Sequence, residues 1–180
     1  MYKINLFEKF GERLIWGHDM GEEYREKILS EWKNSGQDIL NIDFNGISII
    51  DYSASSDIIC IPISRLAGEL EGKHIVISNA IKDVKENIIV TLERQELCCI
   101  NMFEENNYEI IGKCSEGLKN IIQLLHENKS MDSRMLAERL NTTVQVINNR
   151  TTTLYKLGII KRNSIDAPTG GKQYIYESII

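Results

Sequence analysis

The stretch DYSASSD, residues 51–57, places carboxylates and hydroxyls between two runs of isoleucine. It opens an expected helix, and the unpaired N–H groups at a helix N-terminus favour negative charge. Two interpretations stay open. Ser53 is either a simple N-cap, with Asp57 favouring the first turn, or the acceptor of a phosphate. A phosphate on Ser53 would add about −1.5 to −2 charges, which Asp51 and Asp57 would repel.

A second set of polar side chains falls on one side of an expected helix over residues 142–158. Its other side is apolar and faces inward, through Val144, Ile147, Leu154 and Leu157. Asn and Gln make bidentate contacts to adenine, and Thr meets a thymine methyl or a phosphate. Arginine on the helix flank, and cations at the base and tip of the following hairpin, suit phosphates or the minor groove. The residues expected to contact DNA are Thr143, Gln145, Asn148, Asn149, Arg150, Thr152, Lys156, Arg162 and Lys172.

The same helix allows plainer interpretations. Asn148, Asn149 and the neighbouring threonines also suit a merely solvated face, and small modules of this kind can serve as dimerisation or protein-binding units. DNA binding and a protein-only role therefore both stay open at this point.

The acidic residues do not indicate catalysis. Asp43, Asp51 and Asp57 are accompanied by no histidine or thiol nucleophile. The glycine-rich patterns G-x-G-x-x-G and G-x-x-x-x-G-K-[ST], which cradle nucleotide phosphates, are absent. We therefore expect no enzyme and no cofactor.

The cysteines and histidines do not indicate a metal site. The four cysteines include no C-x-x-C pair, and Cys98 and Cys99 are adjacent, a spacing that makes a strained bridge. Reduced, mostly buried thiols are expected. His18, His74 and His126 are far apart in the sequence, without metal-ligand spacing.

The first part of the chain alternates short apolar runs with amphipathic stretches. Strands are expected over 4–7, 13–16, 38–44, 74–78, 98–103 and 108–112, and helices over 21–36, 53–72 and 83–97. Gly36 suits a helix end, and Pro62 predicts a kink or break in the second helix. Such alternation is typical of an α/β sheet covered by helices.

The last part of the chain has a different order, with helices first and strands last. The helices are expected over 115–129, 132–141 and 142–158, and the strands over 159–162 and 174–179. Asp132 is the expected N-cap of the second helix, and Gly158 the end of the third. Pro168 and Gly170-Gly171 mark a long hairpin loop between the strands.

Charge divides the chain between these two parts. Residues 1–112 carry 11 basic and 20 acidic residues, a net −9, and residues 113–180 carry 10 and 6, a net +4. An acidic module that closes at Gly112 and a basic one that follows predict different partners. No apolar run approaches about 18 residues, and MYKINLFEKF lacks the pattern of a signal peptide. We expect a cytoplasmic protein with no membrane partner.

Residues 115–180 resemble the winged helix-turn-helix of bacterial transcription regulators. The resemblance lies in IIQLLHENKSMDSRMLAERLNTTVQVINNRTTTLYKLGIIKR. Its marks are an apolar first helix, Leu136-Ala137 and Leu140 in the second, a polar turn at 141–143, and Leu154, Leu157 and Gly158 closing the third. Thr151 falls where this family usually has an apolar residue, which predicts looser helix packing. The resemblance implies double-stranded DNA as the partner and a homodimer that reads two half-sites.

The run DILNIDFNGISIIDYSASSDII resembles the STAS domain of bacterial anti-sigma-factor antagonists, in the STAS-like form often attached to a helix-turn-helix. That family has a strand, a short connection, and an Asp-Ser-Ser/Thr-Gly sequence that opens a helix. Asp51 matches the family's Asp and Ser53 its phosphoacceptor. Tyr52 replaces the first Ser and Ala54 the Gly. The resemblance covers about residues 14–103 and implies a partner kinase with a histidine-kinase-like ATPase fold.

The expected fold class is therefore α/β, with a STAS-like mixed sheet and helices over residues 1–112. A small C-terminal winged helix-turn-helix domain follows over residues 113–180. The expected function is DNA-binding transcription regulation, coupled through the link near Lys113 and Cys114. The alternative is a partner-switching protein that binds a kinase and never touches DNA. A small-molecule sensor is a third possibility, although the sequence indicates no specific pocket.

Overall fold

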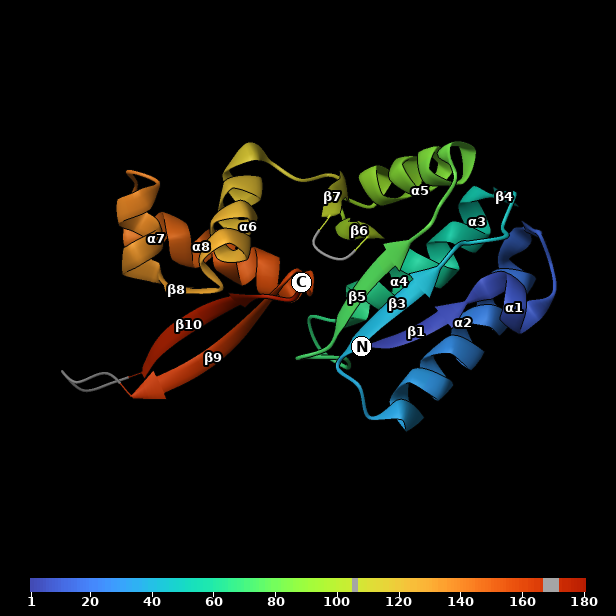
Figure 1. The fold of residues 1–180 in the computed structure, drawn as a ribbon, viewed down its shortest axis with the longest axis horizontal. Helices are drawn as coiled ribbons and strands as arrows, with labels where there is room; N and C mark the ends of the chain where they lie inside the picture. The colour runs from blue at the N-terminus through green and yellow to red at the C-terminus, as the bar shows by residue number, and fades with distance from the viewer. Residues whose placement is uncertain (105–106, 167–171) are drawn as a thin grey trace.

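The computed structural model describes residues 1–104, 107–166 and 172–180, which form two groups of elements (Figure 1). The first group, up to Gly112, is built on a five-stranded sheet. The second group, from Glu116 on, combines helices with a three-stranded sheet. Its last two strands form a hairpin that projects away from the first group (Figure 1).

The five-stranded sheet is mixed, which confirms the α/β class expected from the alternation. Its order is β1-β3-β5-β6-β7, with the first four strands parallel and β7 antiparallel at the edge. The strands are β1 (Tyr2–Asn5), β3 (Ile39–Asp43), β5 (His74–Ser78), β6 (Cys98–Glu104) and β7 (Asn107–Gly112). The first strand ends earlier than predicted. Asn5 accepts a 2.8 Å hydrogen bond from the Glu8 N–H and so caps a short helix, α1 (Leu6–Phe10).

Helices cover one face of this sheet. Each successive parallel strand lies on the same side of the one before it, and right-handed crossovers then place the connecting helices on a single face. These are α2 (Gly17–Ser35), a helical stretch over residues 52–65, and α5 (Lys82–Arg94). Leu40, Ile42 and Ile77 of the sheet meet them in the first hydrophobic core.

The helix α2 ends where predicted but begins earlier. Gly36 has a φ of 67°, a left-handed conformation that glycine adopts readily and that ends the helix. The start lies at Gly17 instead of Gly21 because the Asp51 carboxylate accepts a 3.0 Å hydrogen bond from the Gly17 N–H. This contact gives one of the unpaired N–H groups at the helix start a partner.

The helix predicted over 53–72 is shorter and irregular. It consists of α3 (Tyr52–Ser55), a π-helical turn η1 (Ser56–Cys60) and α4 (Ile61–Arg65). Pro62 has no N–H to donate to the carbonyl four residues earlier. The turn before it is widened, and the Ile61 N–H donates to the Ser56 carbonyl. The irregularity predicted from Pro62 is thus present as a π-helical turn, and the segment after Arg65 forms turns instead of helix.

The second group follows the predicted order with one addition. It contains α6 (Glu116–Asn128), β8 (Ser130–Asp132), α7 (Ser133–Arg139), α8 (Val144–Lys156), β9 (Ile160–Asp166) and β10 (Lys172–Ser178). The short strand β8 was not predicted. It joins an antiparallel sheet of order β8-β10-β9. Asp132 caps α7 as predicted, and its Oδ1 accepts 2.8 Å hydrogen bonds from the N–H groups of Arg134 and Met135.

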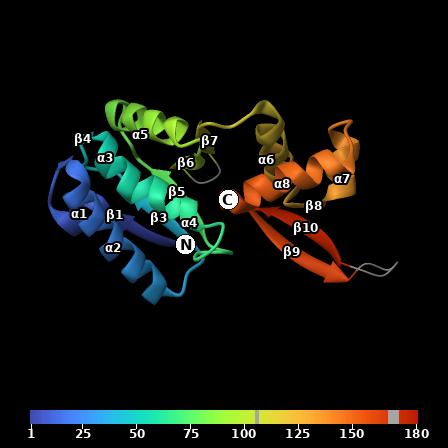
Figure 2. The same cartoon turned by 180° about the vertical axis from the view of Figure 1, so that it is seen from behind.

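A second hydrophobic core joins the two groups. The face of the large sheet that the first helices leave open contributes Val76 and Ile100, and α6 contributes Ile121 and Leu125. Seen from behind, α6 and α8 lie beside the β6–β7 end of the sheet (Figure 2). The two groups therefore share packed side chains and are not joined by the chain alone.

Candidate functional site

The helix α8 presents the polar face that the sequence predicted. Ile147 and Leu154 are fully buried, whereas Gln145, Asn149 and Lys156 are exposed to solvent. Asn148 is also exposed, and Thr152 is half-buried. Thr143 is exposed just before the helix, and its Oγ1 accepts a 3.3 Å hydrogen bond from the Val146 N–H. Thr143 is therefore the N-cap of α8 as well as a candidate DNA contact.

Two inward residues of this helix differ from expectation. Val144 was predicted to face inward but is 40% exposed, because it is the first helical residue and lies beyond the edge of the second core. Leu157 is half-buried and packs against both cores, so it faces inward as predicted. Thr151 is fully buried, and its hydroxyl donates to the carbonyls of Ile147 at 3.0 Å and Asn148 at 3.2 Å. This bonding gives a polar residue in the core a partner within its own helix.

The side chain of Asn148 is already in contact with α7. Ser133 Oγ donates a 2.6 Å hydrogen bond to Asn148 Oδ1. The amide nitrogen of Asn148 is left as a donor, while no hydrogen bond to the Asn149 side chain occurs among the described residues. Asn149 is thus the freer of the two for base contacts. Ser133 was not a predicted site residue, because its distance of 15 positions from Asn148 gave no sequence signal.

Arg150 lies on the flank of α8, as predicted, and is turned toward α6. A Cβ atom placed on Gly117 would come within 2.6 Å of Arg150 Cζ, so the guanidinium lies directly over this glycine. Arg150 can therefore reach phosphate only at the edge of the polar face, beside the first turn of α6.

Arg162 lies at the base of the β9–β10 hairpin, as predicted, between two aromatic rings. Its Cζ is 4.0 Å from the ring centre of Tyr155 and 4.8 Å from that of Tyr174. The stacking holds the cation in place through its attraction to the ring faces. The side chain of Lys172, predicted for the hairpin tip, lies outside the described residues.

The second group carries cations that its own acids do not neutralise. In the part of the chain that the structure describes, the only ion pair of this group joins Lys119 to Glu116. The remaining cations with described side chains in helices and strands are Arg134, Arg139, Arg150, Lys156, Lys161 and Arg162. Cations without acidic partners are available to phosphates.

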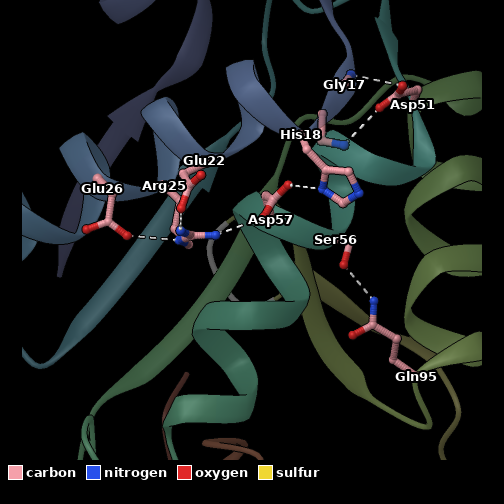
Figure 3. A network of polar contacts seen from close by, with 10 residues as sticks. Gly17, His18, Glu22, Arg25, Glu26, Asp51, Ser56, Asp57 and Gln95 are labelled. Atoms are coloured by element: carbon pink, nitrogen blue, oxygen red, sulfur yellow. Dashed lines mark hydrogen bonds and ion pairs between the residues drawn. The ribbon is translucent and has the colours of Figure 1, made fainter.

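The second candidate site lies where the strand β4 (Ile49–Ile50) meets α3. Asp51 is the N-cap of α3. Its Oδ1 accepts from the Ala54 N–H at 2.8 Å and its Oδ2 from the Gly17 N–H at 3.0 Å (Figure 3). The interpretation of Ser53 as the N-cap is therefore wrong, because Asp51 already occupies that position. Ser53 is the second helical residue and is half-buried.

Asp57 is buried and paired, so it is not the free charge expected beside Ser53. Its Oδ1 accepts a 2.8 Å hydrogen bond from Arg25 Nη1, and its Oδ2 lies 2.8 Å from His18 Nδ1 (Figure 3). Burial lowers the pKa of Arg25, but hydrogen bonds to Glu26 and Glu22 and the charge of Asp57 raise it above its usual value overall. Of the two carboxylates predicted to repel a phosphate on Ser53, Asp51 is the one that could still do so.

The helix α2 approaches this region through a glycine. A Cβ atom on Gly21 would lie 2.8 Å from Asp57 Cβ and 2.9 Å from Ala54 Cα. No larger residue at position 21 fits this distance without a shift. This close approach brings Arg25 and His18, both on α2, within reach of Asp57.

His18 is another residue that was not predicted as part of this site. It is separated from Asp57 by 39 positions, and no local pattern joins them. The His18 side chain is 74% exposed, so its Nε2 is open to solvent. Among the described residues, no hydroxyl or thiol is hydrogen-bonded to His18, and no group of three or more His, Cys, Asp or Glu residues could hold a metal ion.

Exposed apolar side chains surround the start of α3. The strands β2 (Leu14–Ile15) and β4 (Ile49–Ile50) pair in parallel and place Leu14 opposite Ile49. Trp16 follows β2 and is 71% exposed, and Tyr52 follows Asp51 beneath the guanidinium of Arg94. We call this surface the apolar patch; its members are Leu14, Trp16, Ile49 and Tyr52.

The first group also holds a cavity of about 520 Å³ between α2 and the turns that follow α4. Its apolar lining includes Leu29, Trp32 and Leu70, and lysines, an arginine and glutamates line it as well. This cavity was not predictable from the sequence, because α2 and the turns that form it are far apart in the chain.

Comparison with known proteins yields no family. No family model matches the chain, and no curated protein matches its sequence. Within the described ranges, no helix has the length and apolar character needed to cross a membrane.

Proposed function

We propose that the protein is a cytoplasmic, homodimeric, DNA-binding transcription regulator. In this proposal, residues 113–180 form a winged helix-turn-helix domain that binds double-stranded DNA. Residues 1–112 form a STAS-like domain that receives a signal. The helix α8 lies in the major groove, and the β9–β10 hairpin contacts the adjacent backbone or minor groove. Two protomers would read half-sites about 34–36 Å apart.

The observation that carries this proposal is the solvent-exposed polar face of α8. Gln145, Asn149 and Lys156 face solvent while the opposite side of the helix is packed in the second core. Amides of this kind match the donor and acceptor pattern of adenine in the major groove. The unneutralised cations around α8 supply the sequence-independent attraction to phosphate.

The order of the elements gives further support. In helix-turn-helix proteins, the second helix of the pair enters the major groove while the first crosses the backbone. The helix α8 takes the second place after α7, and the two helices pack against each other through the Ser133–Asn148 contact. The hairpin that follows α8 projects away from the rest of the molecule (Figure 1), which keeps it accessible to a duplex.

The test begins with a genome-wide DNA-binding selection on the purified full chain, followed by affinity measurements on the preferred duplex. Asn149→Ala should weaken specific binding by about 1–3 kcal/mol and relax the preference at one base position. Gln123→Ala is the matched control, because Gln123 is an exposed amide on α6, away from the polar face. It should leave the affinity unchanged.

Salt dependence tests the electrostatic part. Lys156→Ala should reduce the slope of log K against log[salt] by about 0.9 if Lys156 neutralises one phosphate. Folded protein that binds no duplex even at low salt would contradict the proposal.

A second candidate function is the docking of a protein partner, such as a kinase with an ATPase fold, beside Ser53. The observation that favours it is the apolar patch, since exposed apolar side chains gathered at one place mark interaction surfaces. Trp16→Ala should weaken binding to such a kinase, whereas Met135→Ala, an exposed apolar residue on α7, should not. Ser53→Asp should change partner binding and leave the fold intact; unchanged binding would remove the regulatory role of Ser53.

The two candidates are separated by one double variant. Replacing Asn148 and Asn149 together with alanine should abolish DNA binding under the first proposal. Under the second, the same variant should behave as the unmodified protein, because the apolar patch belongs to the first group.

A further inference from the structure

Two cysteines that are 16 positions apart in the sequence lie near each other at the junction of the two groups. Cys98 begins β6 and is fully buried, and Cys114 is half-buried in the segment between β7 and α6. In the β6–β7 pairing, Cys98 lies opposite Gly112, and the Lys113 N–H donates a 2.8 Å hydrogen bond to the Leu97 carbonyl. This pairing returns the chain at Cys114 to the side of Cys98.

The side chains as well as the backbones meet. Cys98 belongs to the second core, Cys114 packs against the same core, and each thiol shifts the pKa of the other. Disulfide formation requires two cysteines whose side chains already approach each other, because the bond tolerates little backbone movement. Here the antiparallel pairing supplies that approach.

We propose that Cys98 and Cys114 form an oxidation site, which a hydroperoxide converts into an intramolecular disulfide. The bond would tie the segment that leads into α6 directly to β6. Disulfides of proteins in a reducing compartment are usually transient and redox-sensing, and this one would form and open at the single chain connection between the two groups. The chemistry does not depend on DNA binding.

Cys114 is the thiol that meets the oxidant. It is the more exposed of the two, and its pKa is lowered by the neighbouring Cys98 thiol and by the positive charge of Lys119. The pKa of Cys98 is raised by the neighbouring Cys114 thiol and by burial. The thiolate is the nucleophile in cysteine oxidation, so Cys114 reacts first and Cys98 resolves.

The reaction proceeds in two steps that balance. The Cys114 thiolate attacks the hydroperoxide: an S–O bond forms, the O–O bond breaks, and the leaving oxygen takes a proton to give an alcohol, or water from hydrogen peroxide. The Cys98 sulfur, losing its proton, then attacks the Cys114 sulfenic acid, and the hydroxyl leaves as water. Two electrons pass from the thiols to the peroxide.

The remaining two cysteines serve as internal controls. Cys60 and Cys99 lie in the first core, on the other face of the sheet, and both are buried. Burial raises the pKa of Cys60 to about 12 and also raises that of Cys99. Neither forms a thiolate readily or meets solvent, so both should stay reduced.

The experiment treats the folded full chain with hydrogen peroxide, then unfolds it, alkylates the free thiols and maps the peptides by mass spectrometry. The expected product is a cross-linked pair of peptides that contain Cys98 and Cys114, with Cys60 and Cys99 alkylated. Dithiothreitol should restore all four thiols. Cys114→Ser should abolish the cross-link, and Cys60→Ser should leave it intact.

Cys98→Ala gives a second line of evidence, since Cys114 should then stop at the sulfenic acid, which dimedone traps. Circular dichroism checks that each variant is folded. If Cys98→Ala is not folded, the comparison of the cross-link in Cys114→Ser and Cys60→Ser still tests the proposal. Four alkylated cysteines after oxidation, or a dimer linked through Cys114, would overturn the proposal. A cross-link that persists in Cys114→Ser would do the same.

Discussion

Tyr155, near the end of α8, donates a 3.1 Å hydrogen bond from its hydroxyl to Glu71 Oε1, in the turns before β5. The same tyrosine ring carries the guanidinium of Arg162. A residue of the proposed DNA-contacting helix is thereby connected both to the acidic first group and to the base of the hairpin. The contact lies at the surface, so its contribution to stability is modest.

The Tyr155–Glu71 contact can be measured with a double-mutant cycle. Tyr155→Phe removes only the hydroxyl and should lower the free energy of unfolding by about 0.5–1.5 kcal/mol. Adding Glu71→Ala to this variant should lower the free energy of unfolding by less than Glu71→Ala does in the unmodified protein, because the hydroxyl partner is already gone. Tyr174→Phe is the control; its ring also stacks on Arg162, but no hydrogen bond of its hydroxyl occurs among the described residues. Strict additivity of the two changes would contradict the contact.

Because Arg25 and Asp57 form a buried pair, we expect the loss of Asp57 to destabilise the protein more than the loss of the exposed His18 does. Asp57→Ala leaves the Arg25 guanidinium buried without this partner and should destabilise the protein by about 3–5 kcal/mol. His18→Ala removes the exposed partner and should cost less than about 1 kcal/mol. Urea unfolding of both variants measures the difference. Equal losses would mean that His18 supports the structure as much as Arg25 does.

The close approach at Gly21 predicts a steric effect. Gly21→Ala places a methyl group 2.8 Å from Asp57 Cβ, so a helix must shift, at a cost of about 1–3 kcal/mol. Gly68→Ala is the matched control, because nothing lies within 4 Å of a Cβ atom there. Thermal unfolding should show a lower midpoint for Gly21→Ala alone. A midpoint equal to that of Gly68→Ala would show that the helices can separate at little cost.

His74 predicts a dependence of stability on pH. It is buried in β5, with Nδ1 2.9 Å from the Gly158 carbonyl oxygen. Burial lowers its pKa more than the Gly158 contact raises it, and Asp38, Lys73 and Lys161 exert smaller effects. The unfolded chain takes up a proton near pH 6.5, whereas the folded protein does not, so stability should fall as the pH drops below about 6.5.

The pH effect is tested by urea unfolding at about pH 7.5 and about pH 5.5. His74→Gln keeps a polar side chain but cannot take up a proton. It should show a smaller loss of stability between the two conditions than the unmodified protein. Equal losses in both would assign the effect to other groups.

Features set by short-range patterns were predictable from the sequence. The strand 74–78 was predicted within its observed bounds, as were the Gly36 helix end and the Asp132 cap. Each depends on residues within a few positions of one another. The polar face of α8 was likewise readable from helical periodicity, except at Val144, where the position at the helix start outweighs the periodicity.

Features that depend on distant residues were not predictable. The role of Asp51 as the cap of α3 depends on backbone geometry, and the burial of Asp57 depends on Arg25, 32 positions away. The strand β8 is short and pairs with β10, near the other end of the second group. Pro62 predicted an irregularity at this point in the helix, but not its π-helical form.

Because the two groups share the second core, the C-terminal group is expected to lose stability when it is separated from the large sheet. If the chain were cut after Gly112, Val76 and Ile100 of the sheet would be exposed to water, and α6 would lose the apolar side chains that cover it. Each fragment would then tend to associate with other copies through these uncovered side chains. The C-terminal group is therefore not expected to fold independently. A fusion of this group to another protein would need other apolar side chains in place of the sheet face that it has lost.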